Sequence, residues 1–272
     1  MNGRAVTARI LSGLARAGLA SALVLGFSGT HNRGPLYGRS SGLSRLAAFP
    51  RIVLWAWEKP EDLRFIDPGN AGVAYLSKTI TLKGSRVLVR PRLQPLMLPP
   101  RTMVMPVVRI ELDRSEPATF DSLQLEGAAS FIVSEAGSRP ADAIQVDFDA
   151  PASARPFYRS LLSEVHRRLA PGFPLSITAL ASWCIGDSWL SDLPVDEAVP
   201  MLFRMGADTT PVLNHLASGG DFRARPARSS LGISVDEPIS ALPFGRRIYI
   251  FDPKPWSEGD LKTALSRLAG VR

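Results

Sequence analysis

Eight short runs rich in β-forming residues recur along the chain, and this recurrence constrains the fold more than any other feature of the sequence. Segments between them have helix-like spacing or capping residues, at 118–134, 153–169 and 257–268. Strands that alternate with helices form parallel sheets, because parallel neighbours need a crossover connection. Eight such strands are what a closed (β/α)8 barrel requires. The predicted strands are 51–57, 72–77, 106–112, 143–149, 175–181, 198–205, 231–236 and 247–252.

We therefore predict an α/β fold, an irregular (β/α)8 TIM-type barrel, which a chain of 272 residues with 45% hydrophobic content can support. The first and eighth strands should hydrogen-bond to each other and bring Trp55 near Ile250. Residues 79–82 and 86–90 flank a Lys-Gly-Ser turn and predict a β-hairpin inserted after strand two. An open doubly wound sheet is the alternative, although the G-x-G-x-x-G sequence that would favour it is absent.

The N-terminal region has the layout of a targeting segment. Arg4 and Arg9 precede an apolar stretch at 17–27, and a small-x-small end follows at 26–28. The stretch is shorter than the roughly 20 residues that a membrane-spanning helix needs. We expect a signal peptide or N-terminal anchor at 1–28, a linker at 29–50 and a single barrel domain at 51–272. A periplasmic or secreted location follows; an extension on a cytoplasmic protein is the alternative.

Composition argues against several classes of partner. The formal net charge of +7 invites a nucleic-acid interpretation, but Arg4, Arg9 and Arg16 belong to the leader, and no basic stretch is interleaved with aromatic residues. We therefore expect no nucleic-acid partner, and membrane contact only through an uncleaved leader. One cysteine, Cys184, and three histidines provide neither a disulfide nor a zinc site, so we predict no metal and no cofactor.

The fourth predicted strand is the most informative. Apolar Ile144, Val146 and Phe148 alternate with a polar set, so the two sets face opposite sides of the sheet. If the apolar set faces the helices, the polar set enters the barrel and rises toward its C-terminal end, where barrel enzymes keep their active sites. That polar set is Gln145, Asp147 and Asp149.

The same period-two argument gathers further side chains at this end of the barrel. Carboxylates there can transfer protons or bind hydroxyl groups, and indole rings can stack on the C–H faces of a sugar. The sequence therefore predicts a carbohydrate site. The candidate catalytic residues are Asp149, Asp147, Glu111 and Asp236, and the candidate ligand-binding residues are Glu58, Trp57, Arg109, Trp183, Arg204 and Asp252.

Four stretches, at 51–58, 144–150, 175–184 and 196–206, resemble a bacterial family known as domain of unknown function 3142. The resemblance covers roughly residues 51 to 252. It implies a glycosidase-like barrel, and it carries no assigned activity.

A shorter resemblance is to the chitinase-like glycosidases, whose fourth strand ends in alternating acids. The last of these acids is a glutamate that acts as general acid. Asp149 falls where that glutamate would be, and Gln145 replaces the first acid. Aspartate is one methylene shorter and the first acid is missing, which puts that family's mechanism in doubt here.

The sequence leaves open whether the chain is an enzyme. One hypothesis is an exported glycoside hydrolase acting on a bacterial or environmental polysaccharide, with Asp149 as acid and Asp147, Glu111 or Asp236 assisting. Arg109 and Arg204 are the available cations: if they lie beside Asp147, that residue stays ionised while Asp149 can keep a proton, and otherwise one of the two pKa values should rise. In the alternative, these charges only pair with one another. A non-catalytic carbohydrate-binding module and an envelope structural protein are further alternatives, and the oligomeric state stays open.

Overall fold

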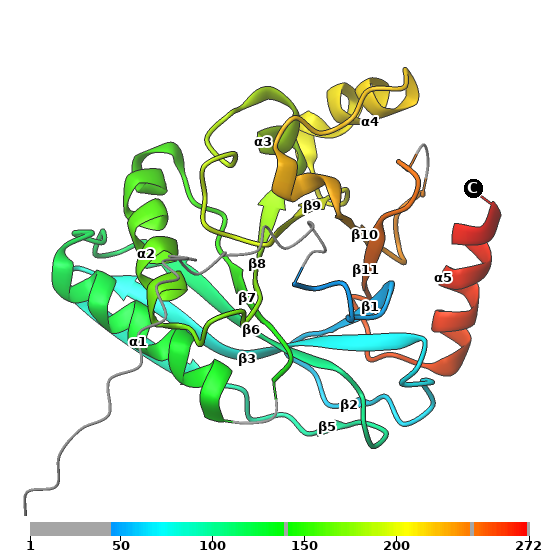
Figure 1. Cartoon of the computed structure of the whole chain (residues 1–272), viewed down its shortest axis with the longest axis horizontal. Coiled ribbons are helices and arrows are strands. Elements are labelled where there is room, and N and C mark those ends of the chain that lie inside the picture. The colour runs from blue at the N-terminus through cyan, green and yellow to red at the C-terminus, as the bar shows by residue number, and fades with distance from the viewer. Residues whose placement is uncertain (1–44, 139–140, 240–241, 271–272) are drawn as a thin grey trace, which may run out of the picture. The chain divides into compact units, whose positions relative to one another are not determined.

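A computed structural model describes residues 45–138, 141–239 and 242–270. Its centre is a closed barrel of eight parallel strands, as predicted (Figure 1). Strand β1 pairs in parallel with β11 on one side and with β3 on the other, so the sheet has no gap. Leu54 is opposite Ile250, and Trp55 is opposite Phe251, which confirms the predicted closure. The barrel strands are β1 (Ile52–Ala56), β3 (Ala71–Lys83), β6 (Val104–Leu112), β7 (Ile144–Asp147), β8 (Leu175–Leu180), β9 (Glu197–Met201), β10 (Ser230–Ser234) and β11 (Arg247–Phe251).

The predicted hairpin after strand two is also present. Strand β3 continues beyond the barrel and turns back at Gly84, whose φ of 52° is left-handed. The returning strand β4 (Arg86–Pro91) pairs antiparallel with it. Two short strands, β2 (Glu61–Asp62) and β5 (Leu96–Met97), form a separate two-stranded parallel sheet.

Helices cover the outside of the barrel. Helices α1 (Ser122–Ser138) and α2 (Arg155–Arg168) lie side by side, and α5 (Glu258–Gly270) lies on the other side of the barrel (Figure 1). The backbone N–H of Asp260 donates to Ser257 Oγ at 3.2 Å, which is the predicted cap. The remaining helical pieces are η1 (Ala152–Ala154), α3 (Ala181–Gly186), η2 (Gly206–Asp208), α4 (Thr209–Ala217) and η3 (Arg225–Arg228).

The alternation of side chains creates two apolar layers. Ile144, Val146 and Phe148 belong to the large core between strands and helices, as predicted. A smaller cluster that includes Val107 and Tyr249 fills the barrel interior. The polar residues of the same strands therefore point toward the barrel axis.

Part of the expected linker belongs to the folded domain. Residues 45–50 close the barrel at the N-terminal ends of the strands, where Leu46 and Phe49 are buried. The Arg247 guanidinium donates hydrogen bonds to the carbonyls of Leu46, Phe49 and Pro50, and these bonds hold residues 45–50 against the end of the barrel. The rest of the predicted linker and the leader lie outside the described residues.

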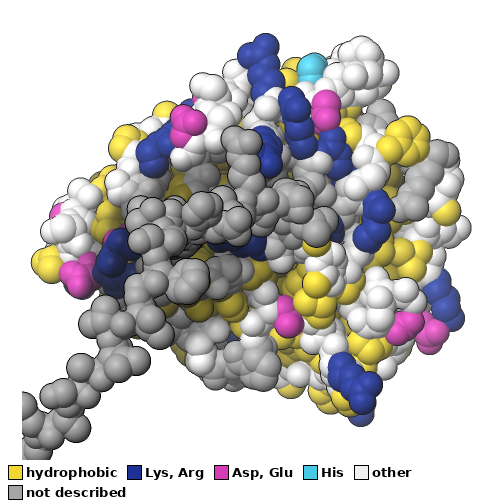
Figure 2. All heavy atoms as spheres, in the orientation of Figure 1, with side chains coloured by type: hydrophobic (Ala, Val, Ile, Leu, Met, Phe, Trp, Pro, Cys, Tyr) yellow, Lys and Arg dark blue, Asp and Glu magenta, His cyan; other side chains and the backbone are white. Residues whose placement is uncertain are grey.

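The described surface carries mixed charge. On the face in Figure 2, Lys and Arg side chains are spread out, several of them beside Asp or Glu. Within the described ranges, no helix is long and apolar enough to cross a membrane.

Candidate active site

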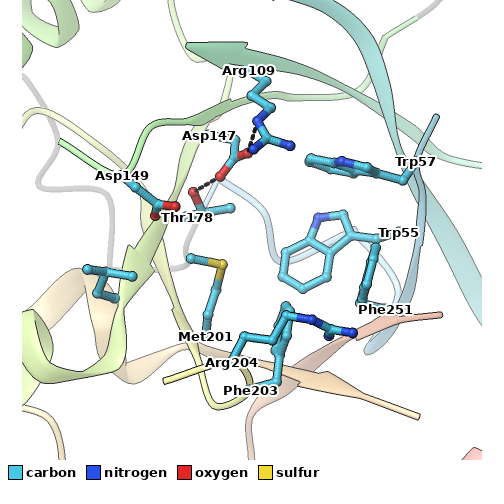
Figure 3. Close-up of a pocket in the computed structure, with 11 residues that line it drawn as sticks. Trp55, Trp57, Arg109, Asp147, Asp149, Thr178, Met201, Phe203, Arg204 and Phe251 are labelled. Atoms are coloured by element: carbon cyan, nitrogen blue, oxygen red, sulfur yellow. Dashed lines mark hydrogen bonds and ion pairs between the residues drawn. The ribbon is translucent and has the colours of Figure 1, made fainter. Parts of the chain in front are cut away.

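A cavity of about 240 Å³ opens at the C-terminal ends of the barrel strands. Its lining residues come from the C-terminal halves of the strands or from the positions that follow them. This places the cavity where the alternation on strand four predicted a site. The lining residues are Trp55, Trp57, Arg109, Asp147, Asp149, Thr178, Leu180, Met201, Phe203, Arg204 and Phe251, most of them shown in Figure 3.

Asp147 ends strand β7 and lies deep in the cavity wall. Its side chain is 13% exposed, and it accepts a hydrogen bond of 2.6 Å from Thr178. Arg109 Nε lies 3.9 Å from its second oxygen. Burial raises the pKa of Asp147 to about 6, with the charge of Asp149 acting in the same direction and Thr178 and Arg109 opposing it.

Asp149 lies beside Asp147 at the mouth of the cavity and is the more exposed of the two (Figure 3). The backbone N–H of Ala150 donates to the Phe148 carbonyl at 2.8 Å, so Asp149 occupies the centre of a tight turn at the strand end. Partial burial raises the pKa of Asp149, while Arg109 lowers it.

The structure does not bring both arginines beside Asp147, which was the condition for this residue to stay ionised. Arg204 does not lie beside Asp147, and Arg109 is shared with Glu111, whose carboxylate is closer at 3.1 Å. Asp147 therefore lacks a dedicated cation, and its burial dominates. Burial raises the pKa of both strand-four carboxyl groups, that of Asp147 to about 6.

Arg204 is held over the cavity rim by several contacts. Its φ of 52° is left-handed, which is uncommon for a residue with a side chain. Its backbone N–H donates to Glu237 at 3.0 Å and its guanidinium to Asp236 at 3.0 Å. The guanidinium also lies 5.4 Å from the centre of the Phe251 ring. These contacts fix the backbone in its unusual conformation.

Asp236 lies at this rim, where it pairs with Arg204, and it does not line the cavity. The Ser234 hydroxyl donates to its carboxylate, and this bond together with the charge of Arg204 lowers the pKa of Asp236. Glu111 also lies outside the cavity, in an adjoining groove of about 410 Å³. The groove and the cavity share Arg109, Asp147 and Asp149.

Three predicted ligand-binding residues are not brought to the cavity. Glu58 accepts a hydrogen bond of 2.8 Å from Arg90 of the hairpin. Trp183 turns into the outer core on α3, where its ring meets that of Trp189 at 5.1 Å. Asp252 is buried beyond the end of β11, where it accepts a bond of 2.7 Å from the backbone N–H of Lys254.

The prediction omitted much of the aromatic wall. Trp55, Phe203 and Phe251 line the cavity, with the rings of Phe203 and Phe251 stacked at 5.7 Å. The sequence does contain a feature that identifies Trp55 as a cavity residue. It lies two positions before Trp57, so both indoles are on the same face of the strand. Cys184 is buried and its thiol pKa is raised by burial, in agreement with a packing role.

No cluster of three or more metal-ligating side chains occurs among the residues that the structure describes. Fold and site together define a (β/α)8 barrel with an aromatic cavity that contains two adjacent carboxyl groups. The roles of the individual residues remain predictions.

No protein-family model matches the chain, so membership of the 3142 family is not confirmed. No curated protein matches its sequence. Four chains of solved structures do match. One comes from the crystal structure of the Bacillus cereus spore cortex-lytic enzyme SleL, with 20% sequence identity and a TM-score of 0.45. The match covers 82% of this chain and 59% of the SleL chain, so this chain spans less than two thirds of that protein.

Proposed function

We propose that the protein is a glycoside hydrolase whose cavity binds a sugar unit of a polysaccharide. The observation that carries this proposal is the pair of strand-four carboxyl groups, Asp147 and Asp149, at one aromatic cavity. Sugar hydrolysis requires one carboxyl group that delivers a proton and a second group that acts as base, nucleophile or stabiliser. Burial raises the pKa of both carboxyl groups, which favours the protonated, proton-donating form more than in an exposed aspartate.

The different exposure of Asp149 and Asp147 supports a different role for each carboxyl group. Asp149 is at the mouth, so its carboxyl group can contact the glycosidic oxygen and donate the proton. Asp147 is fixed beneath it by the hydrogen bond from Thr178 and would act as the assisting carboxyl group. Of the predicted assisting groups, Asp147 shares the cavity with Asp149, whereas Glu111 faces Arg109 and Asp236 faces Arg204.

The shape of the site favours a chain-like substrate. The cavity volume of about 240 Å³ lies below the roughly 300–1,000 Å³ of sites for larger ligands, so it suits a single ring. The adjoining groove shares both carboxyl groups with the cavity and offers space for a second unit. Asp149 then lies beside the bond that joins the two units.

The test is hydrolysis of a panel of polysaccharides by the full chain and by Asp149→Asn. We expect the variant to lose turnover at least about a hundredfold, since general acid catalysis typically contributes about 10²–10⁴-fold. Asp62→Asn is the matched control, because Asp62 pairs with Arg64 outside the cavity and its loss should leave turnover unchanged. An Asp149→Asn variant that turns over substrate like the wild type would contradict the proposal.

A second candidate is a carbohydrate-binding protein without catalysis. One observation favours it: Gln145 supplies a neutral amide where the chitinase-like motif has its first acid, and both ends of that amide are engaged in hydrogen bonds. Calorimetry that finds an oligosaccharide ligand, combined with the absence of cleaved products by mass spectrometry, would select this candidate.

We also propose that the protein is exported, on the basis of the basic and apolar order of residues 1–28. N-terminal mass spectrometry of protein from its native host should find a mature terminus near Gly29. Intact Met1 in a cytoplasmic fraction would contradict export without affecting the proposed chemistry.

A further inference from the structure

The floor of the cavity is the indole of Trp55, which is 3% exposed. Its Nε1–H points into the barrel and donates to Gln145 Oε1 at 2.9 Å. An indole N–H can only donate, so this bond assigns the oxygen of the Gln145 amide to the Trp55 side. The amide nitrogen must therefore point to the other side.

A chain of hydrogen bonds continues from that nitrogen. Gln145 Nε2 donates to Ser176 Oγ at 3.0 Å, and Ser176 Oγ donates to Glu197 Oε2 at 3.1 Å. All three side chains are fully buried. A serine hydroxyl has one hydrogen to give, so the bonds run in one direction from Trp55 to the carboxylate. Glu197 is the final acceptor.

Two donors besides Ser176 hold Glu197 in place at the far end of the barrel. Tyr249 Oη donates to Glu197 Oε2 at 2.6 Å, and Arg247 donates to Oε1 at 2.6 Å. Burial and the neighbouring charge of Glu197 raise the pKa of Tyr249, so its hydroxyl keeps the proton it donates. The carboxylate is therefore oriented on both oxygens, and it fixes the direction of every bond up to Trp55.

Packing restricts Trp55 as well. A Cβ on Gly232 would lie 2.8 Å from Trp55 Cη2, so only glycine leaves the indole its present place. The rings of Tyr249 and Phe203 lie 5.1 and 6.1 Å from it. Figure 3 shows the indole extending among the lining side chains below Arg109 and Trp57.

We propose that Gln145, Ser176 and Glu197 form a positioning relay that holds the Trp55 indole as the ligand-contacting floor of the cavity. The small exposed part of the indole would contact a sugar ring bound in the cavity, so the relay fixes the position of that contact. This inference rests on the proposed function for its ligand, whereas the relay itself is a property of the free protein. The three relay residues are positioning residues, because none of them lines the cavity.

The experiment follows the indole N–H resonance of Trp55 in the ¹⁵N-labelled full chain without ligand, assigned with Trp55→Phe. Gln145→Met keeps the side-chain length and removes both bonds, while Ser176→Ala and Glu197→Gln perturb the relay at increasing distance. We expect all three to shift the Trp55 resonance and to speed its hydrogen exchange. The exposed ion pair of Arg86 with Glu116 is unconnected to the relay, so Arg86→Gln should leave the resonance in place.

A shift in Gln145→Met alone would overturn the relay, because Ser176 and Glu197 would then have no influence on Trp55. An unchanged resonance in all three variants would overturn it as well. Ligand affinity tests whether Trp55 contacts the ligand as the cavity floor. Because Gln145→Met loses a hydrogen bond to Trp55, this variant should bind oligosaccharides between about threefold and tenfold more weakly than the wild type. Equal binding by this variant and the wild type would reject the floor and leave the proposed function intact, and loss of turnover in Asp149→Asn tests that function separately.

Discussion

Asp147→Asn should make the protein more stable at neutral pH, although it alters the candidate active site. The ordinary pKa of this carboxyl is 3.8, and burial raises it to about 6 in the folded protein. A folded-state pKa above the unfolded one means that the folded protein binds the proton more tightly. The stability that this carboxyl provides is therefore fully present below about pH 4 and is lost as the pH rises through 6.

The magnitude follows from that difference. At 1.36 kcal/mol for each pH unit, ionised Asp147 costs up to about 3 kcal/mol at pH 8. Asparagine has no charge to bury, and its Oδ1 can still accept the hydrogen bond from Thr178. Arg109 keeps Glu111 as a partner at 3.1 Å, so the substitution does not leave an unpaired buried cation.

Urea unfolding of both proteins at pH 4, 6 and 8 measures the effect. The free energy of unfolding of Asp147→Asn should equal that of the wild type at pH 4 and exceed it increasingly at pH 6 and 8. Asp236→Asn is the matched control of opposite sign, because the pKa of Asp236 is lowered and its ionised form is favoured in the folded state. A variant of Asp147 that is less stable than the wild type at pH 8, or a difference independent of pH, would refute the reasoning.

Two further substitutions test the packing and the charge inside the barrel. Gly232→Ala should lower the free energy of unfolding by about 1–3 kcal/mol, because its Cβ would overlap the pinned Trp55 ring, whereas Gly137→Ala on α1 meets nothing within 4 Å and should cause no loss in the same urea titration. Arg247→Met should cost about 3–5 kcal/mol by leaving the buried Glu197 carboxylate without its cation. Arg90→Met, in an exposed pair with Glu58, should change stability by less than about 1 kcal/mol, and equal losses in the two Arg variants would contradict this account.

The barrel could be predicted because strand alternation and crossover geometry depend on local sequence. Residues two apart share a strand face whatever surrounds them, so Asp147 and Asp149 could be placed at one cavity from the order of apolar and polar residues alone. The same argument placed Arg109 inside the barrel. These predictions needed no knowledge of which side chains meet.

The rest of the site depends on contacts between distant segments. Strand β8 ends at Leu180 and α3 begins at Ala181, so the chain turns and carries Trp183 outward instead of along the strand face. Glu58 is drawn to Arg90, which reaches it only because the hairpin folds back beside the barrel. The pKa of Asp147 depends on burial and on the sharing of Arg109 with Glu111, which the linear sequence does not display.

Gln145 is the neutral member of the polar set of strand four, whose other members are acidic. The substitution Gln145→Glu tests why an amide stands at this position. A protonated glutamate reproduces the amide's pattern, since its carbonyl oxygen can accept from Trp55 and its hydroxyl can donate to Ser176. An ionised glutamate cannot donate, and at a fully buried position its pKa should rise by roughly 3–5 pH units. Gln145→Glu should therefore come closest to the wild type in urea unfolding at about pH 4, where the glutamate is largely protonated in the unfolded chain as well, and lose stability progressively between pH 4 and pH 8. Asp147 titrates in both proteins, so the comparison with wild type at each pH isolates the effect of residue 145.

Gln145→Leu is the control, because its side chain can neither accept nor donate a hydrogen bond at any pH. Its loss of stability relative to the wild type should be constant between pH 4 and 8. If Gln145→Glu showed the same constant loss, the hydrogen-bond direction assigned between Trp55 and Glu197 would be wrong.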